Sequence, residues 1–300
     1  MRRLLCFAMT GMIVLGLTAC ADKPGNQDDP TSGENTTEDI TYQGYITKEE
    51  PSFDIPAIAP PGEGDDITDP APGISAPDTL QVVRVVIPEG FTFYQVARRL
   101  EANGVCTAKA FTDAAQAYEI VSFYAPVSQQ SCYRMEGMLY PDTYEFYLGE
   151  DPTDALRKML NNYAEKSGLP DYDTLILASI IERETRSDEH MAMVSSVFHN
   201  RLKQGMPLQA DATRAYVRDH IGIDPLVSSP EQYAALYDTY QCKALPAGPI
   251  CSPSVRAIEA AKNPSTSDYL YYFFGKDGTN HYTKTYDEHL AAMSQIGVGL

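Results

Sequence analysis

The sequence predicts an α+β protein whose helices pack with a small antiparallel sheet, and three observations predict this class. First, residues 81–87 and 269–274 are short runs of β-branched, aromatic or apolar residues, which is the composition of strands. Second, Gly275-Lys276-Asp277-Gly278 is a turn signal that leads from the later run into another strand at residues 281–284. Third, stretches between these runs repeat apolar residues every three or four positions, as amphipathic helices do.

The first predicted unit covers residues 81–134. Its strand at 81–87 is broken by Pro88-Glu89-Gly90, and Thr92 then caps a helix that runs through Asn103. A second helix is predicted at 107–119. This β-α-α order resembles the LysM-like subdomain that precedes some wall enzymes, and LysM modules bind glycan strands. A subdomain that only packs against its neighbour is the other interpretation, because fold similarity does not establish function.

The second predicted unit covers residues 135–300 and begins with a turn-rich, aromatic segment at 136–144. Asp151-Pro152 precedes its first helix, Asp171 or Asp173 caps the second, and Gly205 closes the third. The four helices of this unit are predicted at residues 153–166, 172–186, 189–204 and 254–262. The strands at 269–274 and 281–284 supply the small antiparallel sheet.

The first 20 residues predict export. Arg2 and Arg3 precede an apolar run at residues 4–17, which is shorter than the roughly 20 apolar residues of a membrane span. Leu17-Thr18-Ala19-Cys20 resembles the lipobox of bacterial lipoproteins, in which the cysteine is lipidated and becomes the mature N-terminus. We therefore expect a protein held by lipid at the extracytoplasmic face of the cell membrane. An ordinary cleaved signal and an uncleaved anchor are the alternatives.

Residues 21–80 predict a disordered tether. They hold 9 of the 21 prolines and 14 of the 41 acidic residues, against only Lys23 and Lys48, so their net charge of −12 is most of the chain's −18. A segment with few apolar residues and strong self-repulsion cannot offset the entropy lost on folding. The acidity thus belongs mainly to the tether. It argues against nucleic acid as a partner, since no basic patch stands out.

The cysteines predict disulfides rather than a metal site. Cys6 leaves with the signal and Cys20 takes the lipid, which leaves Cys106, Cys132, Cys242 and Cys251. An even number in an exported chain favours bridges, and three pairings are possible. We favour the pairs closest in sequence, Cys106 with Cys132 and Cys242 with Cys251. No Cys-x-x-Cys occurs, so zinc is not expected, and nothing in the sequence calls for a cofactor.

Two glutamates in one predicted helix are the candidates for chemistry. The chain has no Gly-x-Ser-x-Gly, His-Glu-x-x-His or phosphate-binding glycine loop, but residues 179–185 place Glu182 and Glu184 in an otherwise apolar helix. Residues two apart lie about 200° apart, so the two cannot act on one bond. Apolar surroundings favour a neutral acid that can donate a proton. Geometry alone does not choose between them, and a solvated surface glutamate is the ordinary interpretation.

From Glu136 to about His289 the chain resembles the endolytic murein transglycosylase family, also called YceG-like. The resemblance rests on several motifs in order, which together are more specific than any one of them. They are Glu136-Gly137 with Tyr140-Pro141-Asp142-Thr143-Tyr144, Ala178 to Thr185, Val194 to Leu202, Met206 to Thr213, Tyr237 to Tyr240, Leu245 to Ile250, His281-Tyr282, Thr285 and Glu288-His289.

The resemblance implies that Glu182, the first glutamate of the pair, is the catalytic acid. The implied reaction cuts the MurNAc–GlcNAc bond inside peptidoglycan strands and closes a 1,6-anhydro ring on the MurNAc. One carboxyl group suffices for this reaction, whereas glycosidases use two. The implied partners are glycan strands and peptidoglycan synthases. A glycan-binding lipoprotein without activity and a scaffold for wall synthesis are the alternatives.

The resemblance also implies a groove beside Glu182. Its expected substrate-binding residues are Gln209, Asp211 and Thr213, with Asn200, Tyr237 and Tyr240 near them. The local interpretations are that Asn200 only ends a helix and that residues 209–213 form a capped turn. Ala212 stands where the family pattern has proline, Asp238 where it has asparagine, and Ala247 where it has a second proline.

Overall fold

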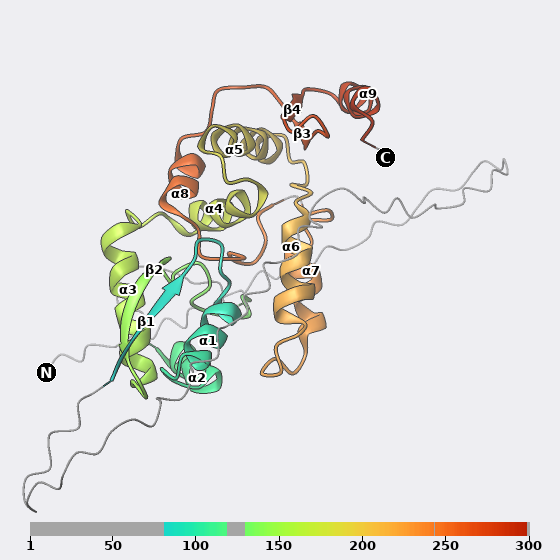
Figure 1. Cartoon of the computed structure of the whole chain (residues 1–300). Coiled ribbons are helices and arrows are strands. Elements are labelled where there is room, and N and C mark those ends of the chain that lie inside the picture. The colour runs from blue at the N-terminus through green and yellow to red at the C-terminus, as the bar shows by residue number, and fades with distance from the viewer. Residues whose placement is uncertain (1–80, 119–129, 243, 299–300) are drawn as a thin grey trace, which may run out of the picture. The chain divides into compact units, whose positions relative to one another are not determined.

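The computed structural model describes residues 81–118, 130–242 and 244–298. The predicted signal, the lipidated Cys20 and the tether at 21–80 lie outside the described residues. Helices and two small antiparallel sheets make up the described chain, which confirms the predicted α+β class (Figure 1).

The first sheet joins two strands that are distant in sequence. Strand β1 (Val82–Ile87) pairs antiparallel with β2 (Asp142–Tyr147), so that Val85 lies opposite Tyr144. Helices α1 (Phe93–Ala102) and α2 (Ala108–Ala117) lie between them in sequence. Thr92 caps α1 through a capping box with Gln95, as its position before the apolar repeat predicts.

The pairing of β1 with β2 joins residues on both sides of the predicted domain boundary between residues 134 and 135. The unit therefore has the order β-α-α-β, and β2 was expected only as a turn-rich segment. Asp142 and the preceding Pro141 are residues that strands seldom contain, so the sequence does not indicate β2. Pairing with β1 supplies the backbone hydrogen bonds of this strand. The LysM-like identification of this unit stays a prediction.

Three helices form the centre of the remaining chain. They are α4 (Tyr172–Glu184), α5 (Asp188–Lys203) and α8 (Val255–Lys262), whereas α3 (Pro152–Lys166) packs against α2. Helix α4 is buried from Leu175 to Glu182 and packs against both α5 and α8. It is apolar around its whole circumference because neighbours cover it on several sides. The carboxyl group of Glu182, which lies in this buried stretch, is thus weakly solvated.

Two boundaries of the predicted elements are wrong for reasons visible in the structure. Helix α4 ends at Glu184, because Thr185 is extended (φ −157°, ψ 156°), rather than at residue 186. Strand β3 (Tyr271–Phe274) begins two residues later than predicted. The amide of Asn200 binds the carbonyl oxygens of Ser267 and Tyr269 and so takes up backbone acceptors before the strand begins.

A group of short helices follows α5. These are α6 (Asp211–Tyr216), the π-helix η1 (Val217–Ile221), the 3₁₀ helix η2 (Pro230–Tyr233) and α7 (Ala234–Tyr237). Each is too short to be stable alone, so tertiary contacts must hold it. After α8, β3 pairs with β4 (Asn280–Thr283), and α9 (Tyr286–Ile296) follows.

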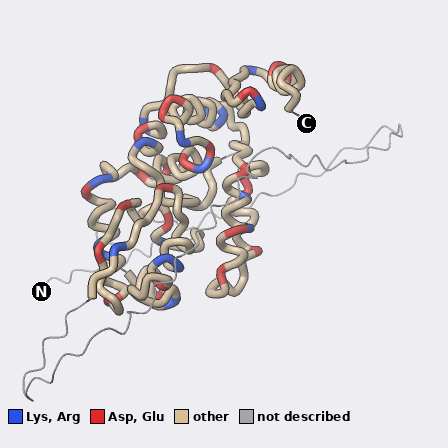
Figure 2. Tube along the Cα trace, viewed as in Figure 1, with Lys and Arg blue, Asp and Glu red and all other residues tan. Residues whose placement is uncertain are grey.

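Charges of both signs are interspersed over the described chain (Figure 2). Many form ion pairs one helical turn apart, such as Lys109 with Asp113 and Arg157 with Asp154. Such exposed pairs contribute only about 0.3–0.5 kcal/mol each. None of the described helices is both long enough and apolar enough to cross a membrane.

Candidate active site

Helix α4 presents its two glutamates to different neighbours. Glu182 lies on the side that meets α8, and Glu184 is the last residue of the helix. Positions two apart cannot share a helix face, so the two carboxylates lie in separate environments. The question left open by the sequence is which environment suits proton transfer.

Glu182 is bound to the start of α8. Its Oε2 accepts hydrogen bonds from the backbone N of Ser254 at 3.0 Å and from the Ser254 hydroxyl at 2.6 Å. Ser254 is the N-cap of α8, whose N-terminus favours a nearby negative charge. The side chain is 8% exposed, and burial raises its pKa although both bonds from Ser254 lower it. Glu182 thus links two core helices.

Glu184 has a different set of neighbours. Burial, and to a smaller extent the charge of Asp211, raise the pKa of its carboxyl to about 7. A hydrogen bond with the Tyr272 hydroxyl and the charge of Arg183 act in the opposite direction. A carboxyl with this pKa is partly protonated near neutral pH and can both give and take a proton. Its position at the C-terminus of α4 also opposes its negative charge.

Arg201 of α5 fixes the chain that leads to Asp211. Its guanidinium is buried and donates to the carbonyl oxygens of Pro207 and Leu208, at 3.2 and 2.9 Å, and to that of Leu270 at 2.6 Å. It also donates to the side-chain Oε1 of Gln209 at 3.0 Å. Gln209 has a positive φ of 53°, which a non-glycine residue rarely adopts. The predicted glycan-binding residue Gln209 is therefore exposed but rigidly held.

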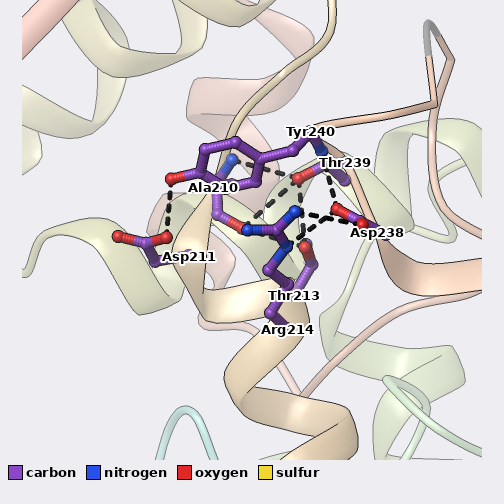
Figure 3. A network of polar contacts seen from close by, with 7 residues as sticks. All are labelled: Ala210, Asp211, Thr213, Arg214, Asp238, Thr239 and Tyr240. Carbon is purple, nitrogen blue, oxygen red and sulfur yellow. Dashed lines mark hydrogen bonds and ion pairs between the residues drawn. The ribbon is translucent and has the colours of Figure 1, made fainter. Parts of the chain in front are cut away.

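A polar network holds the start of α6 against the segment after α7 (Figure 3). Ala210 N donates to the Thr239 hydroxyl at 3.0 Å, and the Thr213 hydroxyl donates to the Ala210 carbonyl at 2.8 Å. Tyr240 donates its hydroxyl hydrogen to Asp211 Oδ1 at 2.6 Å. Three of the predicted site residues, Asp211, Thr213 and Tyr240, thus meet in one network.

The structure brings this network to Glu184 rather than to Glu182. The charge of Asp211 raises the pKa of Glu184, and the charge of Glu184 raises that of Tyr240, whereas Glu182 is surrounded by Ser254, Glu89 and Arg256. The sequence resemblance places Gln209, Asp211 and Thr213 beside Glu182, whereas in the structure Asp211 lies close enough to Glu184 to raise its pKa. The placement of these residues beside Glu182 stays a prediction, because the sequence does not show which side of α4 is covered by α8.

Three of the predicted site residues, Thr213, Tyr237 and Asn200, make hydrogen bonds within the protein. Thr213 and Tyr237 are completely buried, and the Tyr237 hydroxyl lies 3.3 Å from that of Ser131, so neither side chain faces solvent. Asn200 donates to the carbonyls of Ser267 and Tyr269. These residues hold loops in place, and direct contact with a glycan strand is not available to Thr213 or Tyr237.

The structure shows no bond between the predicted disulfide partners, and the two predicted pairings stay predictions. Cys106, Cys132, Cys242 and Cys251 are all free thiols. Cys251 is buried, with its Sγ 3.3 Å from the Ser179 carbonyl oxygen, whereas Cys242 Sγ lies 4.0 Å from that of Leu245. The two thiols of this pair therefore contact different parts of the chain. Burial raises the pKa of Cys106 to about 11, so this thiol is protonated near neutral pH.

A cavity of about 780 Å³ lies elsewhere, between β2 and α3. Its Asp142 pairs with Lys166, and hydrogen bonds from Lys166 and Asn162 lower the pKa of Asp142 to about 2. Such a carboxylate stays ionised and is a poor proton donor. We therefore place the candidate active site at Glu184.

The chain matches the profile of the YceG-like family over residues 71–295. It is 35% identical over 177 residues to an endolytic murein transglycosylase of Bacillus subtilis (strain 168), which covers 54% of this chain and 48% of that protein. It is 28% identical over 254 residues to an endolytic murein transglycosylase of Streptococcus pneumoniae (strain D39), with 72% and 45% covered. The chain thus spans about half the length of these relatives.

A solved structure has a similar fold. The crystal structure of a yceG-like protein from Listeria monocytogenes superposes with a TM-score of 0.57 and 28% sequence identity. The match covers 70% of this chain and 75% of that one.

Proposed function

Since the chain belongs to the YceG-like family, we propose that it is an endolytic lytic transglycosylase that cuts peptidoglycan strands, with Glu184 as its acid and base. The two transglycosylase relatives support the reaction class. The observation that carries the residue assignment is the Glu184 carboxyl, whose pKa of about 7 results from burial and from the charge of Asp211.

The proposed reaction needs one carboxyl group. Protonated Glu184 gives its proton to the glycosidic oxygen between MurNAc and GlcNAc. The C1–O bond breaks, and its electron pair stays with the leaving oxygen. The 6-hydroxyl oxygen of the same MurNAc then bonds to C1 and gives its proton to the Glu184 carboxylate. The acid is restored, no water is consumed, and the product ends in a 1,6-anhydro ring.

Glu184 suits these two proton transfers better than Glu182 does. A general acid and base works best when its pKa is near the working pH. Glu182 is already hydrogen-bonded to Ser254 at the start of α8, and moving its carboxylate would leave the Ser254 N–H without this acceptor. Glu184 instead faces Asp211, an exposed residue of the motif at 206–213.

Product analysis tests the proposed function. Purified protein is incubated with isolated sacculi, and the soluble fragments are identified by mass spectrometry. We expect fragments that end in 1,6-anhydroMurNAc, released from within strands. Fragments with reducing ends would instead identify a hydrolase. Binding to sacculi with no release would favour the glycan-binding or scaffold alternative, in which the chain assists peptidoglycan synthases.

We also propose that Cys20 carries lipid and holds the enzyme at the outer side of the cell membrane. The Leu17-Thr18-Ala19-Cys20 motif supports this location. One acyl chain gives only marginal membrane binding, so stable anchoring requires more than one. Cys20→Ala is expected to move the protein from the membrane fraction to the soluble fraction on centrifugation. If the variant stays fully in the membrane fraction, residues 4–17 form an uncleaved anchor and the lipid proposal is wrong.

A further inference from the structure

Contacts with Arg214 and Asp238 hold the ring and the backbone of Tyr240 in place. Arg214 forms a two-point ion pair with Asp238, with Nε–Oδ1 and Nη2–Oδ2 distances of 2.8 and 3.0 Å. The same guanidinium lies 4.0 Å from the centre of the Tyr240 ring (Figure 3). Asp238 also accepts a bond from the backbone N of Tyr240 at 3.0 Å. The ring is thereby held from its face and from its backbone.

This arrangement aims the Tyr240 hydroxyl at Asp211. The hydroxyl lies 2.6 Å from Asp211 Oδ1, and burial with the adjacent Asp211 charge raises the pKa of Tyr240, so the phenol keeps its proton. The hydroxyl hydrogen is donated to Asp211 Oδ1, which fixes the orientation of this carboxyl group. Asp211 itself is exposed, so its other oxygen is open to a molecule bound at the site.

Four groups face Glu184 from the elements packed around it. They are Arg183 on α4 itself, Asp211 at the start of α6, Tyr272 on β3 and Tyr240 after α7. Asp211 is the only carboxylate among these four. Asp211 is therefore the acidic group that lies beside Glu184.

Resting on the proposed function, we propose that Asp211 is a second functional carboxylate, which stabilises the positive charge that develops on the sugar as the glycosidic bond breaks. Tyr240, held by Arg214 and Asp238, positions it. Asp211 gives and takes no proton: the proton comes from Glu184, and the positive charge on C1 and the ring oxygen disappears when the 6-oxygen bonds to C1. A fixed charge aimed at developing charge is an effective form of transition-state stabilisation.

The test is Asp211→Asn, with turnover on purified glycan strands measured across pH. We expect turnover to fall at least about tenfold, which is less than the roughly 10²- to 10³-fold found for fully preorganised groups because Asp211 meets water. The loss of activity at alkaline pH should also move to lower pH, because removing the Asp211 charge lowers the pKa of Glu184. Asp154→Asn makes the same change in the first turn of α3 and should alter neither property.

Tyr240→Phe is the second variant, in case Asp211→Asn folds poorly. It keeps the ring over Arg214 and removes only the hydroxyl, so turnover should fall by a smaller factor. Wild-type turnover in both variants overturns the proposal. A fall in turnover with an unchanged alkaline limb in folded Asp211→Asn also overturns it, since Asp211 would then only bind substrate. Reducing ends among wild-type products contradict the proposed function itself, whatever these variants do.

Discussion

Glu184→Gln is expected to lower release of anhydromuropeptides by about 10²- to 10⁴-fold, the usual contribution of a positioned acid and base. The amide has the same shape as the carboxyl, but it can neither protonate the glycosidic oxygen nor take the proton of the 6-hydroxyl. The fold should persist, because Glu184 is the last residue of α4 and only half-buried. Product release by the purified variant, with thermal melting as the folding control, measures both expectations.

Glu182→Gln is the matched control on the same helix. The amide oxygen can still accept one bond from Ser254, so α4 and α8 should remain joined. Loss of the charge beside the α8 N-terminus should cost about 1 kcal/mol of the free energy of unfolding. Activity should be largely kept. If Glu182→Gln instead melts normally and loses activity while Glu184→Gln remains active, the assignment implied by the sequence resemblance is right and ours is wrong.

The sequence could narrow the chemistry to two glutamates but could not choose between them. Both have apolar neighbours in the helix, and the choice depends on α8 and α6, which come from distant parts of the chain. One local signal existed. An acidic residue at a helix C-terminus is electrostatically unfavourable. Glu184 is therefore a candidate functional residue once α4 is known to end there. The predicted helix ran two residues further and hid this signal.

The longer elements were predictable because their local signals agree with the fold. Thr92 and Ser254 cap α1 and α8 where the apolar repeats begin, and Gly205 follows α5 with a positive φ of 65°. The short helices α6 and α7 were not predictable, since tertiary hydrogen bonds such as Ala210 to Thr239 hold them. Arg201 was missed as a site residue for the same reason: its four acceptors lie in two loops that meet only in the fold.

Glu136 is another buried carboxyl, and its ionisation is expected to have a large effect on the free energy of unfolding. Its oxygens accept from the backbone N of Phe93, the first residue of α1, at 2.9 and 3.1 Å, and from the Tyr216 hydroxyl at 2.8 Å. It is 1% exposed, and burial raises its pKa to about 8 although these bonds lower it. Glu136 therefore joins α1 to α6 as a neutral acid below that pH.

The pH dependence of unfolding should show this directly. The unfolded chain loses the Glu136 proton near its ordinary pKa of 4.5, whereas the folded chain keeps it up to about 8. Between these values the folded state binds the extra proton, so the contribution of Glu136 to stability is complete below about pH 4.5 and falls as pH rises to about 8. The loss is on the order of 5 kcal/mol.

Two variants separate this effect from simple packing. Glu136→Gln keeps the shape and cannot ionise, so the difference in unfolding free energy between wild type and variant should shrink and then reverse from about pH 5 to about pH 9. Glu136→Ala leaves the Phe93 N–H and the Tyr216 hydroxyl without their acceptor, which costs about 1–3 kcal/mol for each group at every pH. Denaturant unfolding followed by circular dichroism measures both. A wild-type-to-Gln difference that stays constant across this range would show that Glu136 is ionised in the folded protein, because only a proton held by the folded state makes that difference depend on pH.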